Sequence, residues 1–208
     1  MALRISATVM LIGLTAAGAF GTQHLAAGGR HSLRLEADGT LIVWGDGTVG
    51  QLGTGEFRAS ELPAPVVGPG GEGRLTGVAE VAAGACHSLA VREDGSVWAW
   101  GANTFGQLGD GRWGLDGRSA VPVQVLGIGG EGLLRDAVAV AAGRDHSVAL
   151  LGDGTVVAWG SRAQGQLGDG VRESDRWSVH PVRVLAPGGE GALSGVVSIA
   201  CGADHTIA

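Results

Sequence analysis

The sequence predicts an all-β fold, a β-propeller of four-stranded antiparallel blades that is present here as an incomplete arc of about three and a half blades. One segment recurs along the chain, and its marker histidines are 56, 59 and 59 residues apart. Each copy contains short alternating runs that fit four strands, and no segment keeps a helical period. Four-strand units of this length are typical of propeller blades. The marker histidines are His31, His87, His146 and His205.

The centre of each unit is predicted to be a β-hairpin. In the second unit, residues 88–91 and 97–100 alternate on either side of Asp94-Gly95. An Asp-Gly pair between two such runs favours a tight primed turn. The same pair recurs at residues 38–39 and 153–154. Each following strand ends in a tryptophan, for which we predict a role in blade packing: Trp44, Trp100 and Trp159.

The rest of each unit supplies two further strands. In the second unit, Gly-Gln-Leu-Gly at residues 106–109 is followed by a loop and the proline-led run 122–126. A Gly-Gly-Glu-Gly turn then leads to the apolar run 138–142. Unit length varies only in the loop, which is three residues shorter in the first unit. Loops that vary on a constant scaffold are the usual place for recognition.

These residues resemble the repeat of a known family. The pattern Ala-Ala-Gly-x-x-His-Ser, then Asp-Gly-x-Val-x-x-Trp-Gly, then Gly-Gln-Leu-Gly is similar to the repeat of the regulator of chromosome condensation family. The resemblance covers residues 26–208, with three full repeats plus the start of a fourth. It implies a propeller, which typically has seven blades in that family. It also implies several functions, namely guanine-nucleotide exchange, chromatin docking, ubiquitin-ligase scaffolding and, in a secreted member, β-lactamase inhibition; the fold does not choose among them.

The N-terminal segment, residues 1–19, is predicted to be a signal peptide. Arg4 precedes the apolar run 5–14, and small residues end at Ala19, as in a bacterial secretory signal. We therefore expect an exported protein (periplasmic, extracellular or at the cell surface) with no membrane span after signal removal; an uncleaved segment would leave it cytoplasmic. The partial propeller then occupies residues 20–208. Its units lie at about 24–79, 80–138, 139–197 and, incomplete, 198–208.

The number of units bears on closure of the propeller. Three full units and part of a fourth cannot close a ring of seven, so strand edges stay open at both ends of the arc. Either the sequence is a fragment of a longer protein, or the chain self-associates through its open blade edges. We expect the fragment, because a natural terminus rarely falls in the middle of a hairpin.

Composition and spacing argue against several kinds of site. The formal net charge is −6 and no run of arginines occurs, which disfavours nucleic acid as a partner. The marker histidines lie one per unit without a second ligand nearby, so we predict no metal and expect each imidazole to bond the backbone of its neighbour. Glycine-rich stretches such as residues 68–73 open no helix, so no cofactor is expected. Cys86 and Cys201 lie in units two apart and are predicted to be free thiols.

Catalytic patterns are also missing from the sequence. No Gly-x-Ser-x-Gly occurs, and each His-Ser pair places its two side chains on opposite faces of a strand. We therefore predict that the chain is not an enzyme and has no catalytic residues. The variable loops instead contain aromatic and arginine side chains, which are typical of protein-binding hot spots. The candidate contacts are Phe57, Arg112, Trp113, Arg118, Arg176 and Trp177.

The resulting interpretation is an exported, non-catalytic scaffold that binds a protein partner through these loops. An alternative for the loop tryptophans is that their rings fold back onto the blades. One alternative function is an intracellular nucleotide-exchange factor or chromatin-associated regulator, which would need a basic docking surface. Another is a carbohydrate-active enzyme working in the channel mouth, for which no unrepeated acid, base or metal cluster is present.

Overall fold

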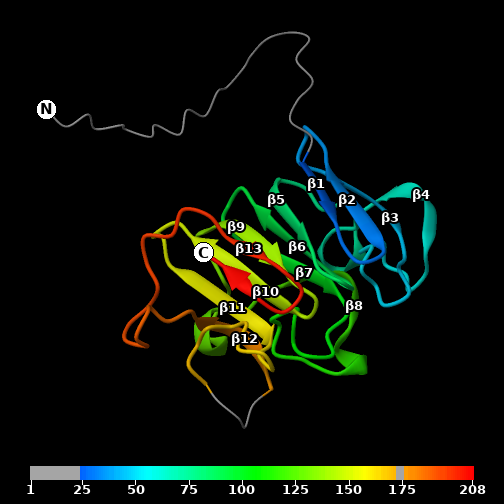
Figure 1. Ribbon diagram of the computed structural model, residues 1–208. Coiled ribbons are helices and arrows are strands. Elements are labelled where there is room, and N and C mark those ends of the chain that lie inside the picture. The colour runs from blue at the N-terminus through cyan, green and yellow to red at the C-terminus, as the bar shows by residue number, and fades with distance from the viewer. Residues whose placement is uncertain (1–23, 172–175) are drawn as a thin grey trace, which may run out of the picture.

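The computed structural model describes residues 24–171 and 176–208, and the predicted signal peptide lies outside them. The described residues form three four-stranded antiparallel sheets and a two-stranded start of a fourth, which confirms the predicted all-β propeller arc (Figure 1). Each sheet is a meander in chain order. The sheets are β1 (His24–Ala27), β2 (His31–Leu35), β3 (Leu41–Gly45) and β4 (Ser60–Pro65); β5 (Val78–Ala83), β6 (His87–Arg92), β7 (Val97–Gly101) and β8 (Ser119–Gln124); β9 (Ala137–Ala142), β10 (His146–Leu151), β11 (Val156–Ser161) and β12 (Trp177–Arg183); and β13 (Ala200–Cys201) with β14 (Thr206–Ile207). Short 3-10 turns are η1 (Pro69–Gly71), η2 (Leu115–Gly117) and η3 (Ile128–Gly130).

The blades meet through their first strands. β5 lies against β1 and β9, and β13 lies against β9, while the later strands of each sheet splay outward (Figure 1). Backbone bonds join the turns after these inner strands. The amide of Gly29 donates to the carbonyl of Gly84 at 3.2 Å, and that of Arg144 donates to Ala203 at 2.8 Å. The expected unit starts at about residues 80 and 139 fall inside β5 and β9.

The hairpin turn between the second and third strands differs from the prediction. In the first blade the amide of Gly39 donates to the carbonyl of Glu36 at 3.0 Å, and only Gly39 of the turn has a positive φ, +76°. This is a three-residue loop, a type I turn followed by a left-handed glycine, so the predicted primed turn is wrong. Asp38 supports it as an acceptor for the amide and hydroxyl of Thr40, at 3.0 and 2.6 Å.

The hydrophobic core lies between consecutive blades. Leu33 and Leu52 of the first blade pack in one cluster with Ala90 and Trp100 of the second. Equivalent clusters join the second blade to the third and the third to the start of the fourth. Each blade is therefore stabilised mainly by its neighbours, as expected for a repeat architecture.

Two smaller observations concern the cysteines and the membrane. Cys86 and Cys201 are free thiols, as predicted, and burial raises the pKa of Cys201 to about 11.

Among residues 24–171 and 176–208, no helix is both long and apolar enough to cross a bilayer.

Candidate functional site

Long loops join the third strand to the fourth in each full blade, and side chains from consecutive loops contact each other. The guanidinium carbon of Arg118 lies 4.5 Å from the ring centre of Phe57, which connects the second loop to the first. The rings of Trp113 and Trp177 are 5.3 Å apart at an angle of 38°, which connects the second loop to the start of β12 in the third blade. We call these two contacting groups, with Phe105 added to the second, the loop stripe.

The loop stripe remains open to solvent. Phe57 is 47% exposed and Trp113 is 58% exposed, while Trp177 is half-buried. The exposed rings therefore pack on side chains of the neighbouring loop, with large areas left free, instead of folding back fully onto the blades. Four of the six predicted contact residues thus lie in two contacting pairs, Phe57 with Arg118 and Trp113 with Trp177. Exposed aromatic rings held in place by their neighbours lose little side-chain entropy on binding.

The two remaining candidates lie beside the stripe. Arg112 is exposed and forms an ion pair with the nearly buried Asp110, with 2.5 Å between Nη2 and Oδ2. Arg176 is also exposed and directly precedes Trp177. Neither side chain belongs to the stacked pairs, so we place both at its polar rim.

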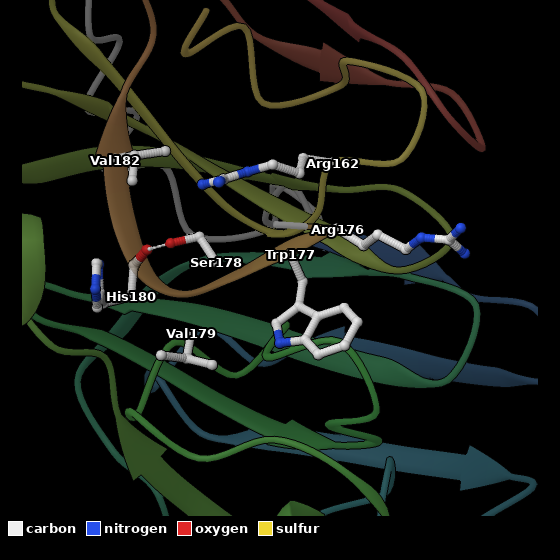
Figure 2. Close-up of a pocket in the computed structure, with 7 residues that line it drawn as sticks. All are labelled: Arg162, Arg176, Trp177, Ser178, Val179, His180 and Val182. Atoms are coloured by element: carbon white, nitrogen blue, oxygen red, sulfur yellow. Dashed lines mark hydrogen bonds between the residues drawn. The ribbon is translucent and has the colours of Figure 1, made fainter. Parts of the chain in front are cut away.

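A pocket of about 450 Å³ lies next to the stripe, where β12 bends (Figure 2). Figure 2 shows the side chain of Arg162 crossing the bend toward Val182, whereas Arg176 extends in the opposite direction. Arg162 is already paired with the carboxylate of Asp169 at 2.8 Å, and both side chains are buried. The positive charge of Arg162 is thus largely compensated by the carboxylate of Asp169. The lining residues are Arg162, Arg176, Trp177, Ser178, Val179, His180 and Val182.

Phe105 was not among the sequence candidates. Its ring centre is 6.2 Å from that of Trp177, at an angle of 60°, so it adds a third ring to the pair of Trp113 and Trp177. The residue precedes Gly-Gln-Leu-Gly, where the other units have Val49 and Gln164. An aromatic residue at a position that is otherwise not aromatic was the signal that could have identified it.

The recurring histidines join one blade to the next. Nε2 of His31 lies 2.9 Å from Oγ of Ser88 in the second blade. That hydroxyl donates to the carbonyl of Gln51 at 2.9 Å, and the indole of Trp100 donates to the same carbonyl at 3.0 Å. The prediction assigned a backbone partner to the histidine. The structure shows instead a hydroxyl of the neighbouring blade, which in turn reaches the backbone.

The same arrangement, which we call the interblade relay, recurs at the next two interfaces. His87 lies 2.9 Å from the hydroxyl of Ser147, and His146 lies 3.1 Å from that of Thr206. Trp159 donates to the carbonyl of Gln107 at 2.9 Å, in the same way as Trp100 donates to Gln51. The relay ends at the two edges of the arc. There Trp44 is only half-buried and His205 is exposed, so these two members do not pack like their counterparts.

Burial keeps the relay imidazoles neutral. Desolvation lowers the pKa of His31 to about 4, that of His87 to about 3 and that of His146 to about 4. Within residues 24–171 and 176–208, no three histidine, cysteine or acidic side chains are grouped closely enough to hold a metal ion. The geometry of the histidines is therefore that of a structural contact.

The turns after the inner strands surround a shallow depression of about 310 Å³ at the centre of the arc. Most of its lining consists of alanine and glycine. Arg144 and Cys201 are the larger side chains, and no carboxylate or imidazole is among the residues that line it. Among residues 24–171 and 176–208, those that line this mouth thus supply no acid–base pair for hydrolysis.

Comparison with known proteins agrees with the sheet arrangement. The model of the Regulator of chromosome condensation (RCC1) repeat matches residues 38–91, 94–150 and 153–208. The chain belongs to the regulator of chromosome condensation repeat family. A second model of the same repeat matches residues 23–51, 78–107 and 137–166 of this family member.

Several relatives contain the same repeats within longer chains. The human probable E3 ubiquitin-protein ligase HERC6 is 36% identical over 184 residues, which is 88% of this chain and 16% of HERC6. The solved structure of human WBSCR16 has a TM-score of 0.69 at 29% identity, covering 88% of this chain and 44% of that one. The structure of Kap60 bound to yeast RCC1 (Prp20) gives a TM-score of 0.66 at 26% identity, covering 91% and 42%. The chain thus spans a minor part of each of these relatives.

Proposed function

We propose that the chain is an exported, non-catalytic scaffold that binds another protein through the loop stripe. The observation that carries the proposal is the row of half-exposed rings, each held by a side chain of the neighbouring loop. Rigid aromatic anchors with an arginine rim are what protein interfaces concentrate at their centres. Yeast RCC1 provides a precedent within the family, since it was crystallised with a protein partner, Kap60.

The double variant Trp113→Ala, Trp177→Ala is expected to weaken partner binding by roughly thirty-fold or more, the effect of losing one interface hot spot. Partners captured from the medium and envelope of the producing cells on the immobilised chain would be purified, and the dissociation constant measured by calorimetry. The far-UV circular dichroism spectrum should not change, because Trp113 is more than half exposed.

The matched control for this binding experiment is Val197→Ser, which removes an apolar side chain that is 93% exposed but lies outside the loop stripe. It should bind like the unmodified chain. Unchanged affinity in the double tryptophan variant would refute the proposal. Loss of its folded spectrum would show that the two rings belong to the core.

Export is supported by the pattern of residues 1–19, with one cation, an apolar run and small residues ending at Ala19. Expression of the full chain, followed by fractionation and N-terminal sequencing of the product, tests it. A mature terminus at Phe20 in the exported fraction is expected. Recovery of an intact Met1 terminus in the cytoplasm would exclude export.

The similarity to yeast RCC1 favours a second candidate, an intracellular nucleotide-exchange or chromatin-associated role. A nucleotide-release assay on a small GTPase separates this role from the first. The chain spans only 16% of HERC6, so the ligase activity for which that protein is named is not carried over to this chain.

We also propose that the two edges of the arc associate with further blades, from a second copy or from a longer chain. Leu25 is 67% exposed at one edge, and Ile207 is 60% exposed at the other. Open strands that carry apolar side chains favour pairing with other strands. Sedimentation velocity over a range of concentrations tests the first case, for which a concentration-dependent dimer is the expected result.

A further inference from the structure

The interblade relay determines which nitrogen of each imidazole carries the proton. The hydroxyl of Ser88 has one proton, and it donates that proton to the carbonyl of Gln51. The bond between Ser88 and His31 must then run the other way, with Nε2–H of His31 as the donor. The same argument holds for His87 with Ser147. The opposite nitrogen, Nδ1, is therefore the unprotonated one.

This second nitrogen is enclosed without a partner. Among the described residues, Nδ1 of His31, His87 and His146 is buried and accepts no hydrogen bond. A glycine backbone closes this side of each ring. A β-carbon placed on Gly84 would lie 2.5 Å from Nδ1 of His87, and one on Gly143 would lie 2.4 Å from Nδ1 of His146. A proton added at Nδ1 would be a buried charged donor with no acceptor in reach.

The charged groups around the three rings differ. The carboxylate of Asp46 raises the pKa of His31 and partly offsets the lowering caused by burial. The carboxylate of Asp204 raises the pKa of His146, whereas His205 lowers it. Burial is the main cause of the lowered pKa of His87; among the described residues, the charges that act on it are those of His31 and His146, which lower it further, and none is a carboxylate. The central interface is thus the one least able to accept a proton.

We propose that the row of His31, His87 and His146 is an acid-sensitive latch that holds consecutive blades together only while the imidazoles are neutral. Protonation at Nδ1 requires the ring to leave its enclosure, which breaks the bond to the hydroxyl of the next blade. At the first two interfaces the carbonyl that accepts this hydroxyl also accepts the indole of Trp100 or Trp159, so opening the latch there exposes a tryptophan. Separation of the blades would also part the stacked pairs of the loop stripe.

The direction of the pH effect follows from proton linkage. In the unfolded chain each histidine titrates near its ordinary pKa of about 6.5. The folded pKa values of about 4, about 3 and about 4 are lower, so unfolding takes up protons at intermediate pH. The stability from the latch is complete above about pH 6.5. It is lost as the pH falls from there toward the folded values.

Urea unfolding between pH 7.5 and 5, followed by tryptophan emission and far-UV circular dichroism, tests the latch. Between pH 6 and 5 the unfolding equilibrium constant should rise several-hundred-fold, because unfolding then takes up between two and three protons. In His87→Gln, whose amide can still donate to Ser147, the rise should be smaller by nearly a factor of ten. In the control His205→Gln, which alters an exposed ring whose charge is the weakest of the named influences on His146, the rise should stay close to that of the unmodified chain.

If His87→Gln does not fold, His31→Gln at the first interface provides the same comparison. A pH series on the unmodified chain also decides the question without any variant. An equilibrium constant that changes less than ten-fold between pH 6 and 5 would overturn the latch, as would an equal pH dependence in His87→Gln and the unmodified chain. These outcomes do not depend on whether a protein partner is found.

Discussion

Replacing Gly84 with alanine is expected to destabilise the protein by about 3 kcal/mol or more, as an overpacked core contact with a broken buried hydrogen bond should. The added β-carbon would lie 2.2 Å from Cε1 of His87 and 2.6 Å from the carbonyl oxygen of Gly143 in the next blade. The second atom is backbone, so a rotamer change cannot relieve the clash. Urea unfolding monitored by circular dichroism measures the loss.

Gly152→Ala provides the matched control for Gly84. Neither glycine needs a left-handed backbone, and the nearest atom to a β-carbon at Gly152 is the carbonyl oxygen of Asp136, at an ordinary 3.6 Å. A change within about 0.5 kcal/mol is expected at this exposed position. If the two variants were equally stable, the close approach of blades at Gly84 would not be a packing constraint.

The repeat made the blades predictable because hairpin signals are local. Alternating runs around each Asp-Gly pair identified the second and third strands correctly, for example β6 and β7. The turn type was not predictable from the pair alone, since Asp38-Gly39 serves the last two positions of a three-residue loop. The local sequence thus predicted where the chain turns, whereas the turn type depends on how the two strands pair.

Contacts between blades were less predictable than the blades themselves. The partner of His31 is 57 residues away, in the next unit, so no spacing within a unit points to Ser88. The repeat nevertheless contained the relevant signal, because serine or threonine follows each marker histidine. The aromatic and arginine side chains of the variable loops were enough to predict which residues are candidate contacts. Their pairing, such as Trp113 with Trp177, depends on how the arc curves and has no counterpart in the sequence.

Trp159→Ala should cost about 3–5 kcal/mol, the range for removing a buried aromatic side chain from a core. The indole is fully buried between the second and third blades and donates to the carbonyl of Gln107 at 2.9 Å. Trp44 occupies the same position in its own unit, but it is half-buried at the edge of the arc. At concentrations low enough to keep the chain monomeric, Trp44→Ala should therefore cost only about 1 kcal/mol, in proportion to the smaller apolar area it buries.

This pair of variants tests the architecture directly, because the two residues share their repeat position and differ only in whether a preceding blade covers them. Thermal and urea unfolding of both proteins would give the two free-energy changes at one concentration. A loss at Trp44 as large as that at Trp159 would mean that the first blade is covered in solution, by a second copy or by other residues of the chain. Sedimentation of the Trp44 variant would then distinguish these two cases, since only the first predicts that the substitution shifts a dimer toward monomer.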